Sequence, residues 1–244
     1  MPYRRLPNTD SARMKALNTA QEKGTDLPPF KLAFSQGSFR KLQGLIGRYE
    51  NSLQEQKNAY SIQAEKNKEY QKRLRKARLY ISHFIQVVNM AIIRGELPAV
   101  TRKYYQLSED EKKLPSLTTE EEIIEVGKAL IEGEKERTGK GMSPVTNPTI
   151  AVVKVHYDKF MELYNYQQSI KGRTQRAHEE LDNKRKEADD LIQQIWNEVE
   201  DTFKNLPEEI RREKASNYGI VYVFRKNELT GFNLFESSRI EALG

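Results

Sequence analysis

Two long stretches of helix-period apolar residues constrain this chain more than any other feature. In the first stretch, residues 38–94, no glycine or proline occurs between Arg48 and Arg94. Apolar residues recur there, and again from Ile150 to Phe203, at the steps of three, four or seven that place them on one side of a helix. The clearest members are Leu42, Ile46, Tyr49, Leu74, Ala77, Ile81, Phe84 and Val88, and then Val153, Tyr157, Phe160, Leu181, Ala188, Ile192, Ile195 and Val199. The sequence therefore predicts an all-α fold.

The two stretches look like copies of each other. Tyr49 matches Tyr157 at an offset of 108 residues, whereas Ala77 matches Ala188 at an offset of 111. A length change of three residues inside a packed helix would rotate everything beyond it by about 60°, whereas the same change in a turn does no harm. An internal repeat with a turn inside each copy is the favoured interpretation.

Both copies become polar midway, at residues 63–68 and 167–175, which agrees with a turn at each of these places. We therefore predict two duplicated long helical hairpins that pack as an up-down four-helix bundle. The first copy has no glycine or proline at the proposed turn, so two unbroken long helices in an extended antiparallel rod stay open as the alternative.

Pro, Gly and capping signals divide the rest of the chain. Pro28-Pro29 bars helical continuation after a short helix that Gly24 is expected to end. The spacing of Thr118 and Glu121 predicts a capping box, and Asn147-Pro148 predicts the start of the second copy. The expected segments are an N-terminal arm with a short helix (1–36), a first helical repeat (37–107), a connector with a short acidic helix and a Gly/Pro loop (108–148), a second helical repeat (149–217) and a C-terminal β segment and tail (218–244).

The composition becomes β-like near the C-terminus. Residues 220–224 are β-branched or aromatic, and residues 232–235 could pair with them across residues 227–231. This pattern predicts a small C-terminal β-hairpin, which must dock on the helices or on a partner because an isolated hairpin is marginally stable in water. Tyr104, Tyr105 and the aromatic residues of segment 222–224 are the ones that the bundle explains least, so they are candidates for a contact surface. Tyr222 and Phe224 are the candidate protein-contact residues.

Residues that could carry chemistry are sparse. The chain has no cysteine, which excludes thiol chemistry and Cys-ligated zinc, and its three histidines lie far apart in the sequence. Residues 133–141 resemble a phosphate-binding loop only superficially, since Gly141 stands where a magnesium-binding hydroxyl belongs. We expect no catalytic residues, no cofactor and no metal.

No stretch has the roughly 20 apolar residues that cross a bilayer, and no signal peptide is evident, so a cytoplasmic location is expected.

The formal net charge of +6 favours an anionic partner. Residues 66–78 hold seven Lys and Arg against one Glu, whereas the equivalent residues 177–189 hold three Lys and Arg against five Asp and Glu. The basic run could be a solvated face, could pair with the other copy or with another subunit, or could follow a phosphate backbone. The candidate nucleic-acid-binding residues are Lys68, Lys72, Arg73, Arg75 and Lys76.

Residues 146–153 (TNPTIAVV) and 218–225 (YGIVYVFR) resemble segments of uncharacterised bacterial helical proteins. The resemblance covers mainly the second half of the chain, implies no activity and supplies no functional residues. The leading hypothesis is a non-enzymatic structural or protein-interaction bundle that binds another chain or a second copy of itself. Nucleic-acid binding is the second hypothesis, and an enzyme whose site is assembled from separate helices is the third.

Overall fold

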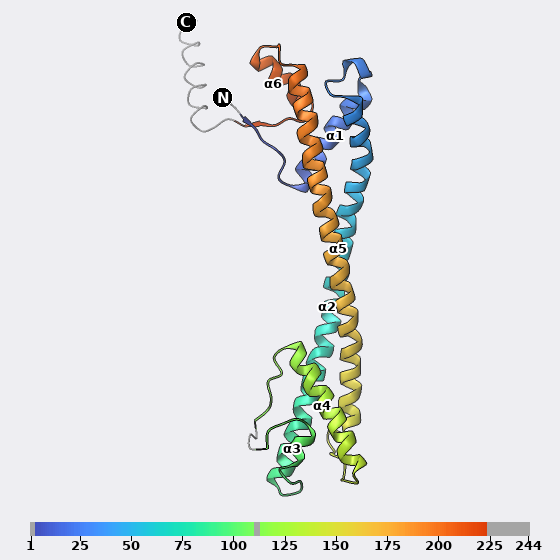
Figure 1. Cartoon of the computed structure of the whole chain (residues 1–244), viewed down its shortest axis with the longest axis vertical. Helices are drawn as coiled ribbons and strands as arrows, with labels where there is room; N and C mark the ends of the chain where they lie inside the picture. The colour runs from blue at the N-terminus through green and yellow to red at the C-terminus, as the bar shows by residue number, and fades with distance from the viewer. Residues whose placement is uncertain (1–2, 110–112, 224–244) are drawn as a thin grey trace, which may run out of the picture. The chain divides into compact units, whose positions relative to one another are not determined.

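In the computed structural model, which describes residues 3–109 and 113–223, the chain is predominantly helical with one small antiparallel sheet (Figure 1). The all-α class is therefore confirmed. The elements are β1 (Tyr3–Arg4), α1 (Asp10–Asp26), the 3-10 turn η1 (Pro29–Lys31), α2 (Gln36–Ile93), α3 (Thr101–Tyr104), α4 (Glu120–Gly139), α5 (Ile150–Thr202), α6 (Glu208–Ser216) and β2 (Tyr222–Val223).

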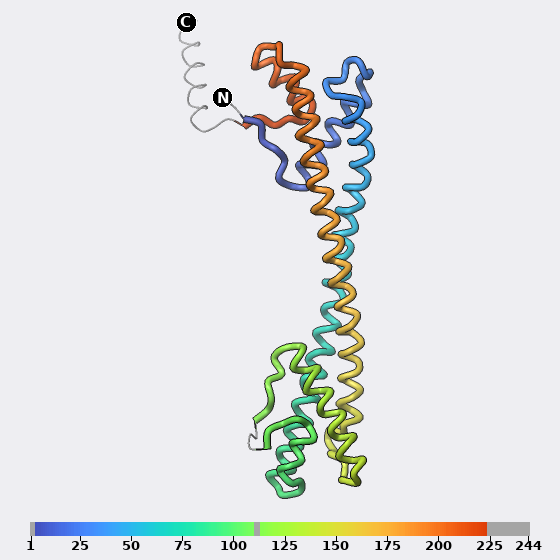
Figure 2. The backbone as a smooth tube through the Cα atoms, viewed as in Figure 1, coloured from blue at the N-terminus to red at the C-terminus, as the bar shows by residue number. Residues whose placement is uncertain are grey.

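The two long segments are continuous helices of 58 and 53 residues, as the unbroken turns of α2 and α5 in Figure 2 show. The predicted turns at residues 63–68 and 167–175 are absent, so the duplicated hairpins of a four-helix bundle are not confirmed. The alternative of two unbroken helices is the one observed. Residues 63–68 in the middle of α2 are Gln, Ala, Glu, Lys, Asn and Lys, and all except Asn67 favour helix, so this polar stretch does not interrupt the backbone.

The chain divides into two compact units, and each long helix contributes to both. Unit 1 contains Met1–Lys57 and Arg176–Gly244, and unit 2 contains Asn58–Gln175. The matched apolar residues in the second half of each copy thus lie in separate cores: Ala77, Ile81 and Phe84 are buried in unit 2, and Ala188, Ile192 and Ile195 in unit 1. Whether the copies arose by duplication stays a prediction.

In unit 1, α1 packs against α2 and α5 through a core that includes Leu17, Tyr49 and Trp196. Thr9 caps α1, since its hydroxyl accepts a hydrogen bond from the Ala12 amide. The expectation that Gly24 ends this helix is wrong. A Cβ at Gly24 would lie 2.2 Å from the Phe39 ring, so this glycine allows close packing inside the helix. The helix ends at Asp26, just before the two prolines.

In unit 2, α4 packs against α2 and α5 over a core that includes Phe84, Ile123 and Phe160. The capping box of α4 is formed by Thr119 and Glu122, one residue later than predicted. Consecutive threonines and glutamates allow either register in the sequence, and burial of the apolar side of the helix decides between them.

The helix α4 continues through Gly133 to Gly139, where the sequence predicted a loop. A contact with another helix explains why α4 continues through this glycine. A Cβ at Gly133 would lie only 2.0 Å from the Tyr104 carbonyl oxygen, so the glycine lets α4 approach the backbone of α3 closely. The helix α5 begins at Ile150, two residues beyond the predicted Pro148.

The strand β2 lies inside the predicted segment 220–224, but its partner comes from the other end of the chain. Tyr3 pairs with Val223 and Arg4 with Tyr222 in antiparallel register. The predicted partner, residues 232–235, lies outside the described residues.

Within the described ranges 3–109 and 113–223, no helix combines the length and apolar character needed to span a membrane.

Candidate interaction surfaces

An outer stripe of four exposed cations, Lys68, Lys72, Arg75 and Lys76, follows one side of α2 in unit 2. Spacings of three, four and seven place these side chains on the side of the helix that faces away from the buried Tyr70, Leu74 and Ala77. In the part of the chain that the structure describes, no carboxylate forms an ion pair with the three lysines of this outer stripe. Four of the five predicted nucleic-acid-binding residues therefore form one surface.

The other cations of the basic run have local partners. Arg73 lies 3.5 Å from Glu69, Lys66 lies 3.2 Å from Glu65, and the guanidinium of Arg78 donates to the Thr118 carbonyl at 3.0 Å. Arg73 is thus the predicted residue that the structure separates from the outer stripe.

Cations of α2 act on His156 of α5. The rings of Tyr80 and His156 stack with their centroids 4.0 Å apart. Burial, together with the charges of Lys76, Lys159 and Arg73, lowers the pKa of His156. Residues 58–175 contain 20 Lys and Arg against 15 Asp and Glu, so unit 2 carries most of the net charge of the chain.

The acidic residues of the second copy are used inside unit 1. Asp182 pairs with Arg185 at 2.6 Å, and Asp189 pairs with Arg13 at 2.7 Å. Glu187 pairs with Lys184 at 2.7 Å. These three carboxylates therefore neutralise cations of their own unit.

The predicted protein-contact residue Tyr222 is half-buried. Its hydroxyl donates to Glu200 at 2.7 Å, and Glu200 also pairs with Arg4 of the neighbouring strand at 3.1 Å. The tyrosine thus helps to hold β1 and β2 against α5. Phe224 lies outside the described residues.

A buried ion pair that the sequence did not predict lies in unit 2. Glu134 and Arg137 are 0% and 1% exposed, and two guanidinium nitrogens of Arg137 donate to the two carboxylate oxygens of Glu134 at 2.8 and 2.9 Å. The Tyr105 hydroxyl and the Val145 amide also donate to this carboxylate. In the sequence, this pair appears only as a Glu and an Arg three positions apart. The same spacing occurs in many exposed pairs of this chain, so it does not indicate burial.

A second network joins three helices of unit 1. Arg185 of α5 donates to both oxygens of Asp10 at 2.8 and 2.7 Å, and the hydroxyl of Tyr49 donates to the same carboxylate at 2.7 Å. The hydrogen bond from Arg185 is the main cause of the lowered pKa of Asp10. Both networks occupy their carboxylates with hydrogen bonds.

Each of the two units contains a cavity. One, of about 410 Å³, lies in unit 1 between the N-terminal arm, α1 and α5, and Arg5 and Lys15 are among its lining residues. The other, of about 340 Å³, lies in unit 2 and includes Tyr70 and Gln167. Among residues 3–109 and 113–223, no group of three or more His, Asp and Glu is arranged to hold a metal ion.

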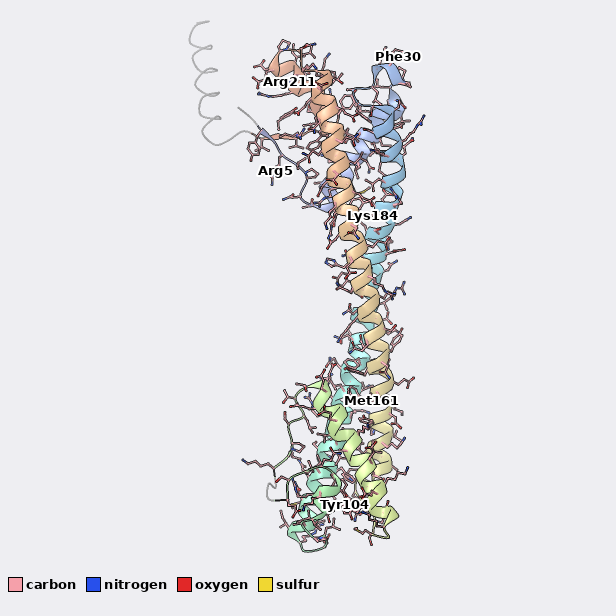
Figure 3. The ribbon with its side chains drawn as sticks, viewed as in Figure 1. Arg5, Phe30, Tyr104, Met161, Lys184 and Arg211 are labelled. Carbon is pink, nitrogen blue, oxygen red and sulfur yellow. The ribbon has the colours of Figure 1, made fainter. Side chains whose placement is uncertain are left out.

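The sequence analysis also did not identify Phe30 as an exposed aromatic residue. Phe30 lies in η1, in the turn between α1 and α2 at one end of unit 1 (Figure 3), with 84% of its surface exposed. The signal in the sequence was the run Pro28-Pro29-Phe30, which was interpreted only as a helix breaker.

Comparison of the chain with protein-family models, curated proteins and solved structures gave no match.

Proposed function

We propose that this chain is a non-enzymatic interaction protein that binds another protein chain. The observation that carries the proposal is Phe30, which has the most exposed large apolar side chain among the described residues. Pro28 and Pro29 restrict the backbone before it, and Ala33 and Phe34, which are 3% and 4% exposed, anchor the backbone after it. A rigidly presented aromatic side chain loses little conformational entropy on binding, and aromatic residues are enriched at protein interfaces.

A non-catalytic role is supported by the way in which the chain uses its acidic groups. Glu134 is completely buried and holds hydrogen bonds from Arg137, Tyr105 and Val145. Asp10 accepts from Arg185 and Tyr49. A carboxylate that is engaged in this way is not free to transfer protons to a substrate.

Replacing Phe30 with serine is expected to reduce association with the partner chain at least about tenfold, because an aromatic anchor at an interface contributes about 2 kcal/mol or more. Folding stability should change by less than about 0.5 kcal/mol, since the phenyl ring contacts mainly solvent. The measurements are sedimentation velocity over a range of concentrations for self-association, and affinity capture with the wild type and the variant side by side.

Val155→Ser is the matched control, because Val155 is an exposed apolar residue of unit 2 with 50% of its surface accessible. The control should retain association. A wild-type chain that stays monomeric at every concentration and captures no partner would count against the proposal. Full association of Phe30→Ser would show that this residue is not the anchor.

The outer stripe of α2 supports a second candidate function, nucleic-acid binding. Four cations on one exposed side of a helix can each contact a phosphate, and each contact releases counterions. Neutralising Lys68, Lys72, Arg75 and Lys76 to glutamine is expected to weaken binding of duplex DNA about 100-fold at low salt. The slope of log K against log salt should also become shallower by about 3 to 4. Fluorescence anisotropy with labelled duplex and single-stranded DNA at two salt concentrations measures both quantities.

The matched control neutralises four exposed lysines outside the outer stripe, namely Lys57, Lys128, Lys135 and Lys204. This variant has the same net charge as the stripe variant. Equal loss of binding in the two variants would indicate attraction by total charge and no defined surface. An absence of wild-type binding even at low salt would eliminate this second candidate.

A further inference from the structure

The cavity of about 410 Å³ in unit 1 is enclosed by parts of the chain that are distant in sequence. The arm between β1 and α1, which carries Arg5 (Figure 3), forms one wall, and one side of α1 forms another. Residues 219–221 and Trp196 of α5 complete it. The volume falls in the range of small-molecule sites, about 300–1,000 Å³.

Small residues leave the space for this cavity. Ala12, Ala16 and Thr19 follow one another at steps of four and three, so they line it from the same side of α1. Gly219 has a φ of +84°, which favours glycine, and a Cβ there would lie 3.4 Å from the Cβ of Thr19. The glycine thus brings residues 220–221 close to α1 as the opposite wall.

The open part of the wall is aliphatic. Leu6 and Val221 line the cavity with 41% and 52% of their surfaces exposed, so a bound apolar group would remove apolar surface from water. The one aromatic residue of the lining, Trp196, is only 1% exposed and offers no ring face for stacking. An aliphatic chain therefore fits this wall better than an aromatic ring does.

The charge of the wall has one sign. Arg5 and Lys15 line the cavity with exposed side chains, and no Asp or Glu lines it. Within the described residues, neither cation forms an ion pair. The hydroxyls of Thr19 and Ser216 donate to carbonyl oxygens within their own helices, at 2.9 and 2.7 Å. The two cations are therefore the charged donors that the wall offers to a ligand.

Acidic groups elsewhere in unit 1 are engaged by other cations. Asp189 pairs with Arg13 of α1 at 2.7 Å, and Glu200 pairs with Arg4, the neighbour of Arg5, at 3.1 Å. The fold thus neutralises the cations next to the cavity wall and leaves the two cations of the wall itself without a counter-ion. An anionic group supplied by a ligand complements them.

We propose that this cavity binds a free fatty acid of medium chain length. Its aliphatic chain lies against Leu6 and Val221, and its carboxylate pairs with Arg5 and Lys15. A carboxylate matches the planar guanidinium group, which donates two parallel hydrogen bonds to it. The assignment goes beyond the proposed interaction function and does not depend on it, because no residue of η1 lines the cavity.

The test is a titration of the full chain with octanoate, followed by calorimetry and by the fluorescence of Trp196, the one tryptophan of the chain. We expect octanoate to bind with a negative change in heat capacity, the sign of apolar burial. Octanol has the same chain without the charge and should bind about tenfold more weakly, since two partly exposed ion pairs are lost. Octylamine, a cation at neutral pH, and acetate, which lacks the chain, should not bind detectably.

Two variants separate the contributions of charge and cavity. The double variant Arg5→Gln/Lys15→Gln should weaken octanoate binding about tenfold and leave octanol binding unchanged. Its matched control, Lys31→Gln/Arg40→Gln, removes two exposed cations of unit 1 outside the cavity and should bind octanoate as the wild type does.

Ala12→Leu replaces a methyl group of the wall with a larger apolar side chain, so it should weaken the binding of both octanoate and octanol. Phe30→Ser should bind octanoate as the wild type does, which keeps this test separate from that of the interaction function. The proposal is overturned if octanoate does not bind. Equal binding of octanoate, octanol and octylamine would also overturn it, as would unchanged octanoate binding by Arg5→Gln/Lys15→Gln.

Discussion

Replacing Gly133 with alanine should lower the free energy of unfolding by about 3 kcal/mol, which is the upper end of the cost of overpacking a core. The new Cβ would lie 2.0 Å from the carbonyl oxygen and 2.6 Å from the carbonyl carbon of Tyr104. Both atoms belong to the backbone, so no side-chain rotation relieves the clash and α3 must separate from α4. Urea unfolding followed by circular dichroism measures the change.

Gly139→Ala is the control, because Gly139 lies in the same helix and a methyl group there would have no atom within 4 Å. This variant should be more stable by about 0.4–1 kcal/mol, since alanine reduces the entropy of the unfolded chain and favours helix. Equal unfolding midpoints for the two variants would show that α4 and α3 do not approach each other as described.

Replacing Glu134 with glutamine should destabilise the protein by about 3–5 kcal/mol, because it leaves the Arg137 guanidinium buried without its counter-ion. Glu136→Gln is the matched control two residues away. Glu136 pairs with Lys140 at 2.7 Å, but both side chains are more than half exposed, so less than about 1 kcal/mol is expected. A double variant with methionine at both 134 and 137 should recover much of the loss, because no buried charge remains.

The same carboxylate makes stability depend on pH. Burial alone would raise the pKa of Glu134, but the hydrogen bonds from Arg137, Tyr105 and the Val145 amide outweigh burial and lower it below 4.5. The folded state therefore binds this proton less readily than the unfolded state does. The stabilisation is present above the unfolded pKa and is lost as the pH falls through the folded pKa.

Urea midpoints measured between about pH 7 and pH 3 should fall at the acid end for the wild type and fall less for Glu134→Gln. Identical pH profiles for the two proteins would show that this ion pair does not form.

Most of the helical content was predictable, because helix periodicity is a local property. The buried residues Ile81, Phe84, Ile192 and Ile195 all lie on the predicted apolar stripes. The outer stripe was also visible in the sequence, since its spacing follows from helix geometry alone. The sequence did not show that the lysines of the outer stripe lack acidic partners, because ion pairing depends on which side chains the fold brings near.

The error about the long segments has a definite physical origin. A polar interruption of an apolar stripe is compatible with a turn and also with polar side chains buried between continuous helices. Gln167 and Thr174 continue the spacing of Phe160, Tyr164 and Ile170 and occupy core positions of α5. That continued spacing was the available signal for an unbroken helix and for the cavity in unit 2.

The sequence by itself determined where helices form, because backbone hydrogen bonds within a helix join residues only four positions apart. Only the tertiary structure decided that Arg4 pairs with Tyr222, that Glu134 and Arg137 are buried together, and that Gly133 continues a helix. These features join parts of the chain that are distant in sequence or depend on close approach between elements. Such contacts leave no periodic pattern, so they arise only when the cores of the two units assemble.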